Sequence, residues 1–261
     1  MPCIRQSGAA VESAPIVRSL GLRFASGHRI DDHGHTWAQV VFAARGVMSV
    51  EAMGKQWVVP PSRSVWMPAG VPHSIEVVGE TWMRTVYLRP DIAAALPDAV
   101  RVIDVSPLLR ELLLEVVRMG CMDEADDVHR NFAGVLVAQL ARAPELELAL
   151  PMPADPRARR VASRVRDDHA ADAPLAALAR GAGASPRTLE RIFLKETGLT
   201  FGRWRQQARL QHAVCLLAQG ASVTTVSFEC GYDSPSAFVT MFKRSLGTTP
   251  GRYMRSADFS P

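Results

Sequence analysis

Two stretches in the C-terminal part of this 261-residue chain resemble each other, and they restrict the fold more than any other feature. Each contains a short apolar segment, a glycine at Gly183 or Gly231, and then a Ser-Pro pair that opens a second periodic segment. Serine is favoured as an N-cap and proline at the first helical position, so both pairs predict helix starts. The stretches Pro174–Gly198 and Ser222–Gly247 therefore predict two helix-turn-helix units in an all-α domain.

The second helix of each unit is predicted to have one apolar side and one polar side. Apolar residues recur there at spacings of three and four, namely Leu189, Ile192 and Phe193 in one copy and Phe238, Met241 and Phe242 in the other. A short helix, a turn and a second helix with a polar, cationic outer side is an arrangement that fits the major groove of DNA. Helical periodicity predicts helices near 157–169, 174–181, 185–197, 201–218, 222–230 and 234–246.

These residues resemble the AraC/XylS-type DNA-binding domain. The resemblance covers both copies, the helix that links them and the closing GTTPGRYMR. It implies a seven-helix module that binds an asymmetric site on double-stranded DNA and activates or represses nearby promoters. RNA polymerase is then a candidate partner, and the resemblance also allows a homodimer. The positions that carry it are Leu178, Gly183, Ser185, Leu189, Arg191, Phe193, Gly198, Val226, Phe228, Gly231, Tyr232, Phe238, Phe242, Lys243, Gly247, Pro250 and Tyr253.

The candidate DNA-binding residues occupy outward positions of the two second helices. By the resemblance, Arg187, Glu190 and Arg191 are base readers, since Arg pairs with guanine and Glu accepts from cytosine. The matching positions of the second copy have short side chains, so we expect that copy mainly to position the protein on the DNA backbone. Capping and helix solubility also explain a serine or arginine at any single position. The full set is Ser185, Arg187, Thr188, Glu190, Arg191, Lys195, Pro235, Ser236, Ala237, Thr240, Lys243 and Arg244.

Charge is unevenly distributed along the chain. Residues 155–261 contain 16 Lys and Arg against 9 Asp and Glu, a net charge of +7, whereas residues 1–154 contain 14 against 17, a net charge of −3. A basic half predicts a polyanionic partner for one domain only. The sequence contains no uncharged apolar run long enough for a membrane span, and its N-terminus lacks the pattern of a secretion signal. We therefore expect a cytoplasmic bacterial protein without membrane contact.

The N-terminal region has a different rhythm. From Leu22 to about Leu88, short apolar runs are interrupted by Gly and Pro, which is typical of an antiparallel barrel or sandwich. Helical periodicity returns after Ser106, a candidate N-cap, and again from Asp127, and predicts a connecting or dimerising helical layer. Four prolines within Pro144–Pro156 predict the interdomain linker, because no helix interior or central strand accommodates them.

A histidine motif in this region resembles the first motif of the cupin barrel. It consists of Gly27, His33, His35, Gln39 and Gly46, with Gln39 at the position where the metal-binding members of that family have Glu. The resemblance implies a small β-barrel with a metal or ligand site inside it.

The second cupin motif is partly present. Pro68, Gly70 and His73 match it, whereas Ser62 stands where Gly is expected and Val77 where Asn is expected. These departures leave the identity of the bound species open.

Strand geometry agrees with a shared site for these side chains. Alternate residues of a strand share a face, so His33, His35 and Gln39 can point into one barrel, with His73 arriving from another strand. Three imidazoles and an amide could hold a divalent transition metal such as nickel, copper or zinc. Without a carboxylate, the set lacks the 2-His-1-carboxylate triad of oxygen chemistry. Two other interpretations stay open: the histidines line a polar pocket without an ion, or they contact a small organic effector.

The sequence as a whole predicts an α+β multidomain protein. The expected parts are a cupin-like antiparallel β-barrel sensor over 1–100, a helical connector with the linker over 101–150, and an AraC-type DNA-binding domain over 157–257 with helix-turn-helix motifs at 174–197 and 222–246. The predicted function is sequence-specific regulation of transcription in response to a small molecule or metal at the barrel, without enzymatic activity. The alternative is a cupin-type metal-dependent enzyme with a helical appendage.

Overall fold

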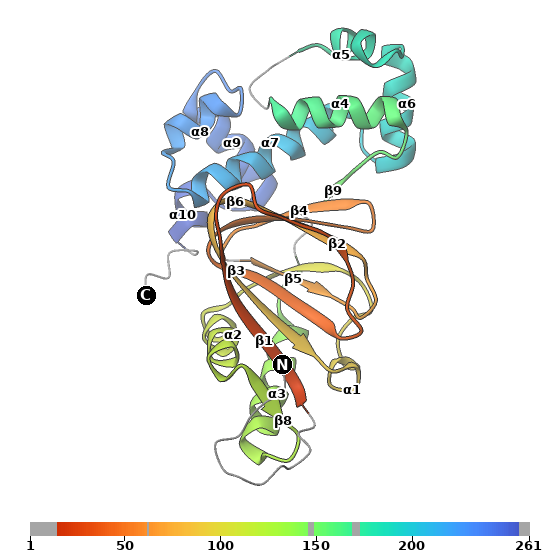
Figure 1. The fold of residues 1–261 in the computed structure, drawn as a ribbon. Helices are drawn as coiled ribbons and strands as arrows, with labels where there is room; N and C mark the ends of the chain where they lie inside the picture. The colour runs from red at the N-terminus through yellow and green to blue at the C-terminus, as the bar shows by residue number, and fades with distance from the viewer. Residues whose placement is uncertain (1–14, 62, 146–148, 169–172, 256–261) are drawn as a thin grey trace. The chain divides into compact units, whose positions relative to one another are not determined.

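The computed structural model describes residues 15–61, 63–145, 149–168 and 173–255, which fall into two compact units (Figure 1). Unit 1 comprises Met1–Val50 and Val59–Glu147, and unit 2 comprises Glu51–Val58 and Leu148–Pro261. The chain therefore passes from one unit to the other three times.

Unit 1 is built on an antiparallel sheet that is open. Its strands follow the order β7, β5, β3, β6, β1, β8, and β2 pairs with β6. This path has two ends, so the predicted closed barrel is wrong, although the antiparallel sheet domain is confirmed. The end strands β7 and β8 are short, and they offer few backbone groups for further pairing. The strands are β1 (Pro15–Phe24), β2 (Arg29–His33), β3 (Ala38–Ala52), β5 (Arg63–Met67), β6 (His73–Leu88), β7 (Arg101–Asp104) and β8 (Cys121–Asp123).

Two helices cover one face of this sheet. α2 (Pro107–Met119) contacts β1 and β6, and α3 (Asp127–Arg142) packs on α2 and β8 (Figure 1). α2 begins at the predicted N-cap, where Ser106 Oγ accepts a hydrogen bond from Leu109 N at 3.2 Å. A short helix, α1 (Pro90–Ala93), follows β6 and was not predicted. The core between sheet and helices includes Val40, Phe42, Val86, Leu88, Leu109, Leu113 and Leu136.

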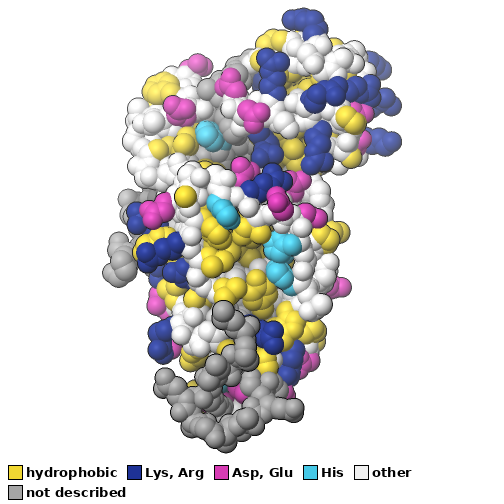
Figure 2. Space-filling model, viewed as in Figure 1, with side chains coloured by type: hydrophobic (Ala, Val, Ile, Leu, Met, Phe, Trp, Pro, Cys, Tyr) yellow, Lys and Arg dark blue, Asp and Glu magenta, His cyan; other side chains and the backbone are white. Residues whose placement is uncertain are grey.

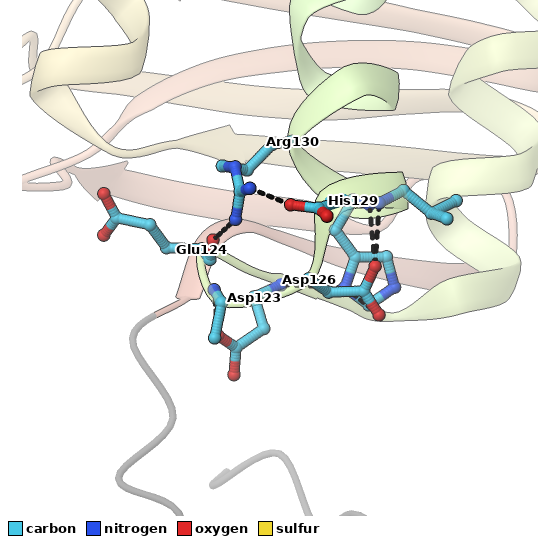
Figure 3. Close-up of polar contacts among 8 residues, drawn as sticks. Asp123, Glu124, Asp126, His129 and Arg130 are labelled. Carbon is cyan, nitrogen blue, oxygen red and sulfur yellow. Dashed lines mark hydrogen bonds and ion pairs between the residues drawn. The ribbon is translucent and has the colours of Figure 1, made fainter.

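The start of α3 is fixed by a local polar network (Figure 3). Asp126 caps the helix by accepting from the backbone N–H groups of Val128 at 2.9 Å and His129 at 3.3 Å. His129 Nδ1 in turn accepts from Asp123 N at 3.1 Å, and Arg130 donates to the carbonyl of Glu124. These bonds satisfy backbone groups that a helix start leaves unpaired, and they tie β8 to α3.

Unit 2 is helical, as predicted. Among the described residues its helices are α4 (Pro156–Asp167), α5 (Leu175–Ala182), α6 (Pro186–Thr197), α7 (Phe201–Ala218), α8 (Val223–Glu229), α9 (Pro235–Leu246) and α10 (Pro250–Arg255). The first six agree with the predicted helices to within two residues at either end. Within the described parts of the chain, none of the helices combines the length and the apolar character that a bilayer span requires.

Trp204 lies at the centre of the core of unit 2. Its side chain on α7 is completely buried, and its ring packs edge-on against Phe193 of α6 at a centroid distance of 5.3 Å. The indole Nε1 donates to the carbonyl of Pro151 at 2.7 Å, so the predicted linker segment is held against the helices. Leu150 and Met152 belong to the same core.

A hairpin that the sequence analysis assigned to the sensor domain groups instead with unit 2. Its strand β4 (Lys55–Val59) pairs with β9 (Leu150–Pro151), with Gln56 opposite Leu150. Gln211 of α7 donates to the carbonyl of Gln56 at 3.2 Å. Hydrophobic patterning could not reveal this grouping, since it depends on pairing between segments distant in sequence.

We predict that Gly46→Ala destabilises unit 1 by about 2–4 kcal/mol, the sum of overpacking and left-handed backbone strain. Gly46 has φ +82°, and a Cβ there would lie 2.8 Å from Thr81 Cα and closer still to Glu80 O. Both contacts are to backbone atoms, and displacing them costs more free energy than moving the end of a flexible side chain. Chemical denaturation of the purified variant measures the change.

The matched control for this substitution is Gly27→Ala. Gly27 also has a positive φ, of +79°, but a Cβ there meets no atom of the described part of the chain within 4 Å. It should cost only about 1 kcal/mol, the backbone contribution. Equal losses of stability in the two variants would contradict the steric argument.

Candidate functional site

The first helix-turn-helix unit is formed by α5 and α6. α5 ends at Gly183, whose φ of +69° and ψ of +37° turn the chain into the next helix. Ser185 caps α6 by accepting from Thr188 N at 3.1 Å, and Pro186 occupies the first helical position. Because Leu189 and Phe193 of α6 are completely buried, the opposite side of α6 faces solvent.

The second unit repeats this construction in α8 and α9. Ser234 caps α9 by accepting from Ala237 N at 3.3 Å, with Pro235 first in the helix. Phe238 and Phe242 are completely buried, with their ring centroids 5.6 Å apart. The duplicated local chemistry thus gives two helices that each bury one side and expose the other.

The structure brings most of the predicted DNA-binding side chains onto these exposed sides. Thr188 and Pro235 are half-buried. Lys and Arg side chains gather over α4, α5 and α6 in the view of Figure 2. The exposed predicted residues are Ser185, Arg187, Glu190, Arg191 and Lys195 on the first copy and Ser236, Ala237, Thr240, Lys243 and Arg244 on the second.

Glu190 also has a contact that the sequence analysis missed. Its Oε2 accepts from Phe201 N, the first residue of α7, at 3.2 Å. A carboxylate at a helix start satisfies an unpaired N–H group and is favoured there by the helix dipole. Glu190 therefore helps to fix α7 relative to α6.

Sequence reasoning also missed Leu194. It lies on α6 and is 56% exposed to solvent. It is one of several large apolar residues that are exposed in the described part of the chain. The sequence signal was available, since Leu194 falls outside the apolar stripe of Leu189, Ile192 and Phe193.

In unit 1, three histidines meet where β2 ends and β6 begins. His33 and His73 are register partners on these strands, and His35 lies in the loop before β3. Their ring centroids are 4.3 to 5.5 Å apart, and one nitrogen from each lies within 4.8 Å of the others. We call these three side chains the histidine centre. Figure 2 shows histidines at the margin of an apolar area on this face of unit 1.

Hydrogen bonds determine which nitrogens of the histidine centre are available. His33 Nδ1 donates to the carbonyl of Asp31 at 2.7 Å, and His73 Nδ1 donates to the carbonyl of Val71 at 3.0 Å, because a carbonyl can only accept. In a neutral ring the remaining Nε2 then has a free lone pair. The Nε2 atoms of His35 and His73 are buried and have no hydrogen-bond partner within the part of the chain that the structure describes.

Burial favours the neutral form of the His35 and His73 rings. It lowers the pKa of both His35 and His73 below the ordinary value, and the neighbouring His33 lowers both further. Neutral imidazole is the form that binds a metal. The donor set and its unpaired, buried nitrogens therefore fit a divalent transition metal.

Gln39, the fourth predicted ligand, forms side-chain hydrogen bonds of its own next to the histidines. Its Nε2 donates to Thr85 Oγ1 at 2.8 Å and to Tyr87 Oη at 3.3 Å, and the Tyr87 ring lies 4.9 Å from that of His35. Its Oε1 is buried without a partner among the described residues. The structure thus places Gln39 in a polar network that adjoins the histidine centre.

Comparison with known proteins gives matches in both parts of the chain. A family model described as a helix-turn-helix domain matches residues 178–256, and one described as an AraC-like ligand binding domain matches residues 22–201. The HTH-type transcriptional regulator NimR of Escherichia coli (strain K12) is 35% identical over 222 residues, which are 85% of this chain and 81% of that protein.

A further relative matches a smaller part of the chain. The HTH-type transcriptional regulator RipA of Corynebacterium glutamicum is 37% identical over 103 residues, 40% of this chain and 31% of that protein. A crystal structure of ToxT from Vibrio cholerae O395 is 12% identical in sequence, with an alignment that covers 94% of this chain and 99% of that chain and a TM-score of 0.41.

The two family models and the similarity to NimR agree with the two helix-turn-helix units and with the separate sheet domain. They give no support to the alternative of a cupin-type enzyme. The chain belongs to the AraC family of helix-turn-helix transcription regulators and contains an AraC-like ligand-binding domain.

Proposed function

We propose that this regulator binds DNA through the exposed sides of α6 and α9, and that a divalent transition metal at the histidine centre controls that binding. The observation that carries the metal proposal is that the buried Nε2 atoms of His35 and His73, beside His33, have no hydrogen-bond partner among the described residues. A buried polar atom without a partner costs free energy, and a bound cation would supply the missing interaction.

Nickel, copper and zinc are the candidate ions, since imidazole suits all three. His33, His35 and His73 are the proposed ligands, and the hydrogen bonds from Nδ1 of His33 and His73 would hold two of the rings in orientation. Gln39 is a further candidate through its Oε1, which has no hydrogen-bond partner in the described ranges. Bound metal would supply a fixed positive charge, and we propose no catalytic role for it.

On DNA, Arg187 and Arg191 are the proposed base readers of α6, because a guanidinium can form two hydrogen bonds with guanine. Glu190 would both read and position, since one of its oxygens already contacts α7. On α9, Ser236, Thr240 and Lys243 would mainly contact the phosphate backbone.

Metal can control DNA binding only if it binds the DNA-bound and free forms with different affinity. By linkage, DNA would then change the affinity for the metal by the same factor. This reciprocity distinguishes a metal ion that regulates DNA binding from an ion with a purely structural role.

The predicted homodimer and the contact with RNA polymerase stay predictions. The surface on which we expect a second copy is that of α2 and α3, where Leu108, Val128 and Val135 are 53%, 66% and 47% exposed. Exposed apolar side chains of neighbouring helices are typical of association surfaces.

We predict that the purified protein binds one nickel, copper or zinc ion per chain and that His73→Ala weakens this binding at least tenfold, roughly the effect of disturbing a metal site. Calorimetric titration of the metal-free protein with each ion separately measures affinity and stoichiometry. An ion at about 100 times its Kd should also stabilise the fold by about 2.7 kcal/mol.

His28→Ala is the matched control for the metal experiment. His28 lies in the same unit but stacks on Phe24, at a centroid distance of 4.3 Å, outside the histidine centre. It should leave metal binding unchanged. The metal proposal is wrong if His73→Ala binds each ion as tightly as the parent protein; binding of an organic compound that His73→Ala abolishes would then favour the effector alternative.

We predict that Arg187→Ala and Arg191→Ala each weaken binding to a preferred DNA site by about 1–3 kcal/mol and relax base preference at one position. Lys243→Ala should weaken binding to all sequences similarly and lower the slope of affinity against salt by about 1. Fluorescence anisotropy with fragments from around the gene, at several salt concentrations, measures both effects.

Arg142→Ala removes the same charge from an exposed site on α3 and serves as the control. It should bind DNA like the parent protein. If Arg187→Ala and Arg191→Ala also leave affinity and base preference unchanged, α6 does not read DNA in the proposed way.

A further inference from the structure

Leu194 lies on the side of α6 that is farthest from the core of unit 2. A helix advances about 100° per residue, so residues 187, 191 and 194 fall within about 60° of one another around the axis. Leu189, Ile192 and Phe193, which are buried, lie on the opposite side. Leu194 therefore shares one outward line with Arg187 and Arg191.

Solvent reaches this leucine. It is 56% exposed, whereas its neighbour Phe193 is completely buried. A single exposed leucine is ordinary on a protein surface. Its position in line with Arg187 and Arg191 on the proposed reading helix is what indicates a ligand, because that line would face the floor of the major groove.

Glu190, one turn before Leu194, is held by a contact to α7. Its side chain is exposed, and its carboxylate accepts from Phe201 N at the start of α7. The first helix-turn-helix unit thus presents two guanidinium groups and one apolar side chain in a row.

The apolar group that B-DNA presents in its major groove is the C5 methyl of thymine. We propose that Leu194 is a specificity-determining residue that contacts a thymine methyl group close to the bases read by Arg187 and Arg191. This inference rests on the proposed entry of α6 into the major groove. The two arginines select hydrogen-bond acceptors on the bases. Leu194 would add a contact that selects a methyl group.

Replacing thymine by deoxyuridine tests the contact, because it removes the methyl group and leaves base pairing intact. The DNA is a site selected from a random-sequence pool by the purified full-length protein. Each thymine is replaced in turn, and affinity is measured by fluorescence anisotropy. For the parent protein, deoxyuridine at one or two positions should lower affinity roughly three- to tenfold, the effect of losing a buried methyl contact.

Leu194→Ala should bind the thymine and deoxyuridine forms of these positions equally. Because the side chain is exposed, the variant should keep its melting temperature. Leu194→Met, which restores an apolar side chain of similar volume, should restore the preference for thymine. Phe228→Ala, at a 54% exposed apolar residue of α8, is the control and should discriminate like the parent protein.

Two outcomes overturn the inference, and they separate it from the proposed function. If Arg187→Ala weakens binding but Leu194→Ala retains the full sensitivity to deoxyuridine, Leu194 contacts no thymine methyl and α6 still reads DNA. If the selection yields no site, or Arg187→Ala and Arg191→Ala bind it unchanged, the proposed function fails and the inference fails with it.

Discussion

The burial of Trp204 is the contact on which the arrangement of unit 2 depends. Its ring closes the core between α6 and α7, and its indole N–H holds the carbonyl of Pro151 in the segment that precedes α4. Burying a tryptophan whose one polar atom is satisfied combines a large apolar area with a directional bond. Because α6 is fixed along its inner side by this contact, its outer side is defined as well. The exposure of Arg187 and Arg191 is a consequence of packing on the other side of the helix.

In the histidine centre, too, one part of a side chain is held by the fold while another part stays available for binding. Backbone carbonyls take one nitrogen of His33 and one of His73, and this leaves the other nitrogen of each ring directed elsewhere. Burial then disfavours protonation of His35 and His73. The backbone thus selects the tautomer of His33 and His73, and burial favours the neutral form of His35 and His73. Neither effect can be seen in the identities of the three residues alone.

Much of unit 2 could be predicted from the sequence because its signals are local. The Ser-Pro pairs at 185 and 234 both cap helices as expected, and the apolar stripes are buried. What could not be predicted depends on distant contacts: the sheet that stays open between β7 and β8, and the bond from Phe201 N to Glu190. The histidines could be grouped from strand parity and a motif. The separate hydrogen bonds of Gln39 to Thr85 and Tyr87 could not, since they require the register of β3 and β6.

The hairpin Glu51–Val58 determines where such a protein can be divided into fragments. Strand β3 begins at Ala38 in unit 1, and its last two residues, Glu51 and Ala52, belong to unit 2. Gln56 and Trp57 are buried, and β9 has β4 as its pairing strand. A fragment that started at the proline-rich segment would therefore lack part of its own sheet pairing and core. Chimaeras that exchange sensor domains at that segment would inherit a mismatched hairpin, so the boundary of exchange has to include residues 51–58 together with the C-terminal helices.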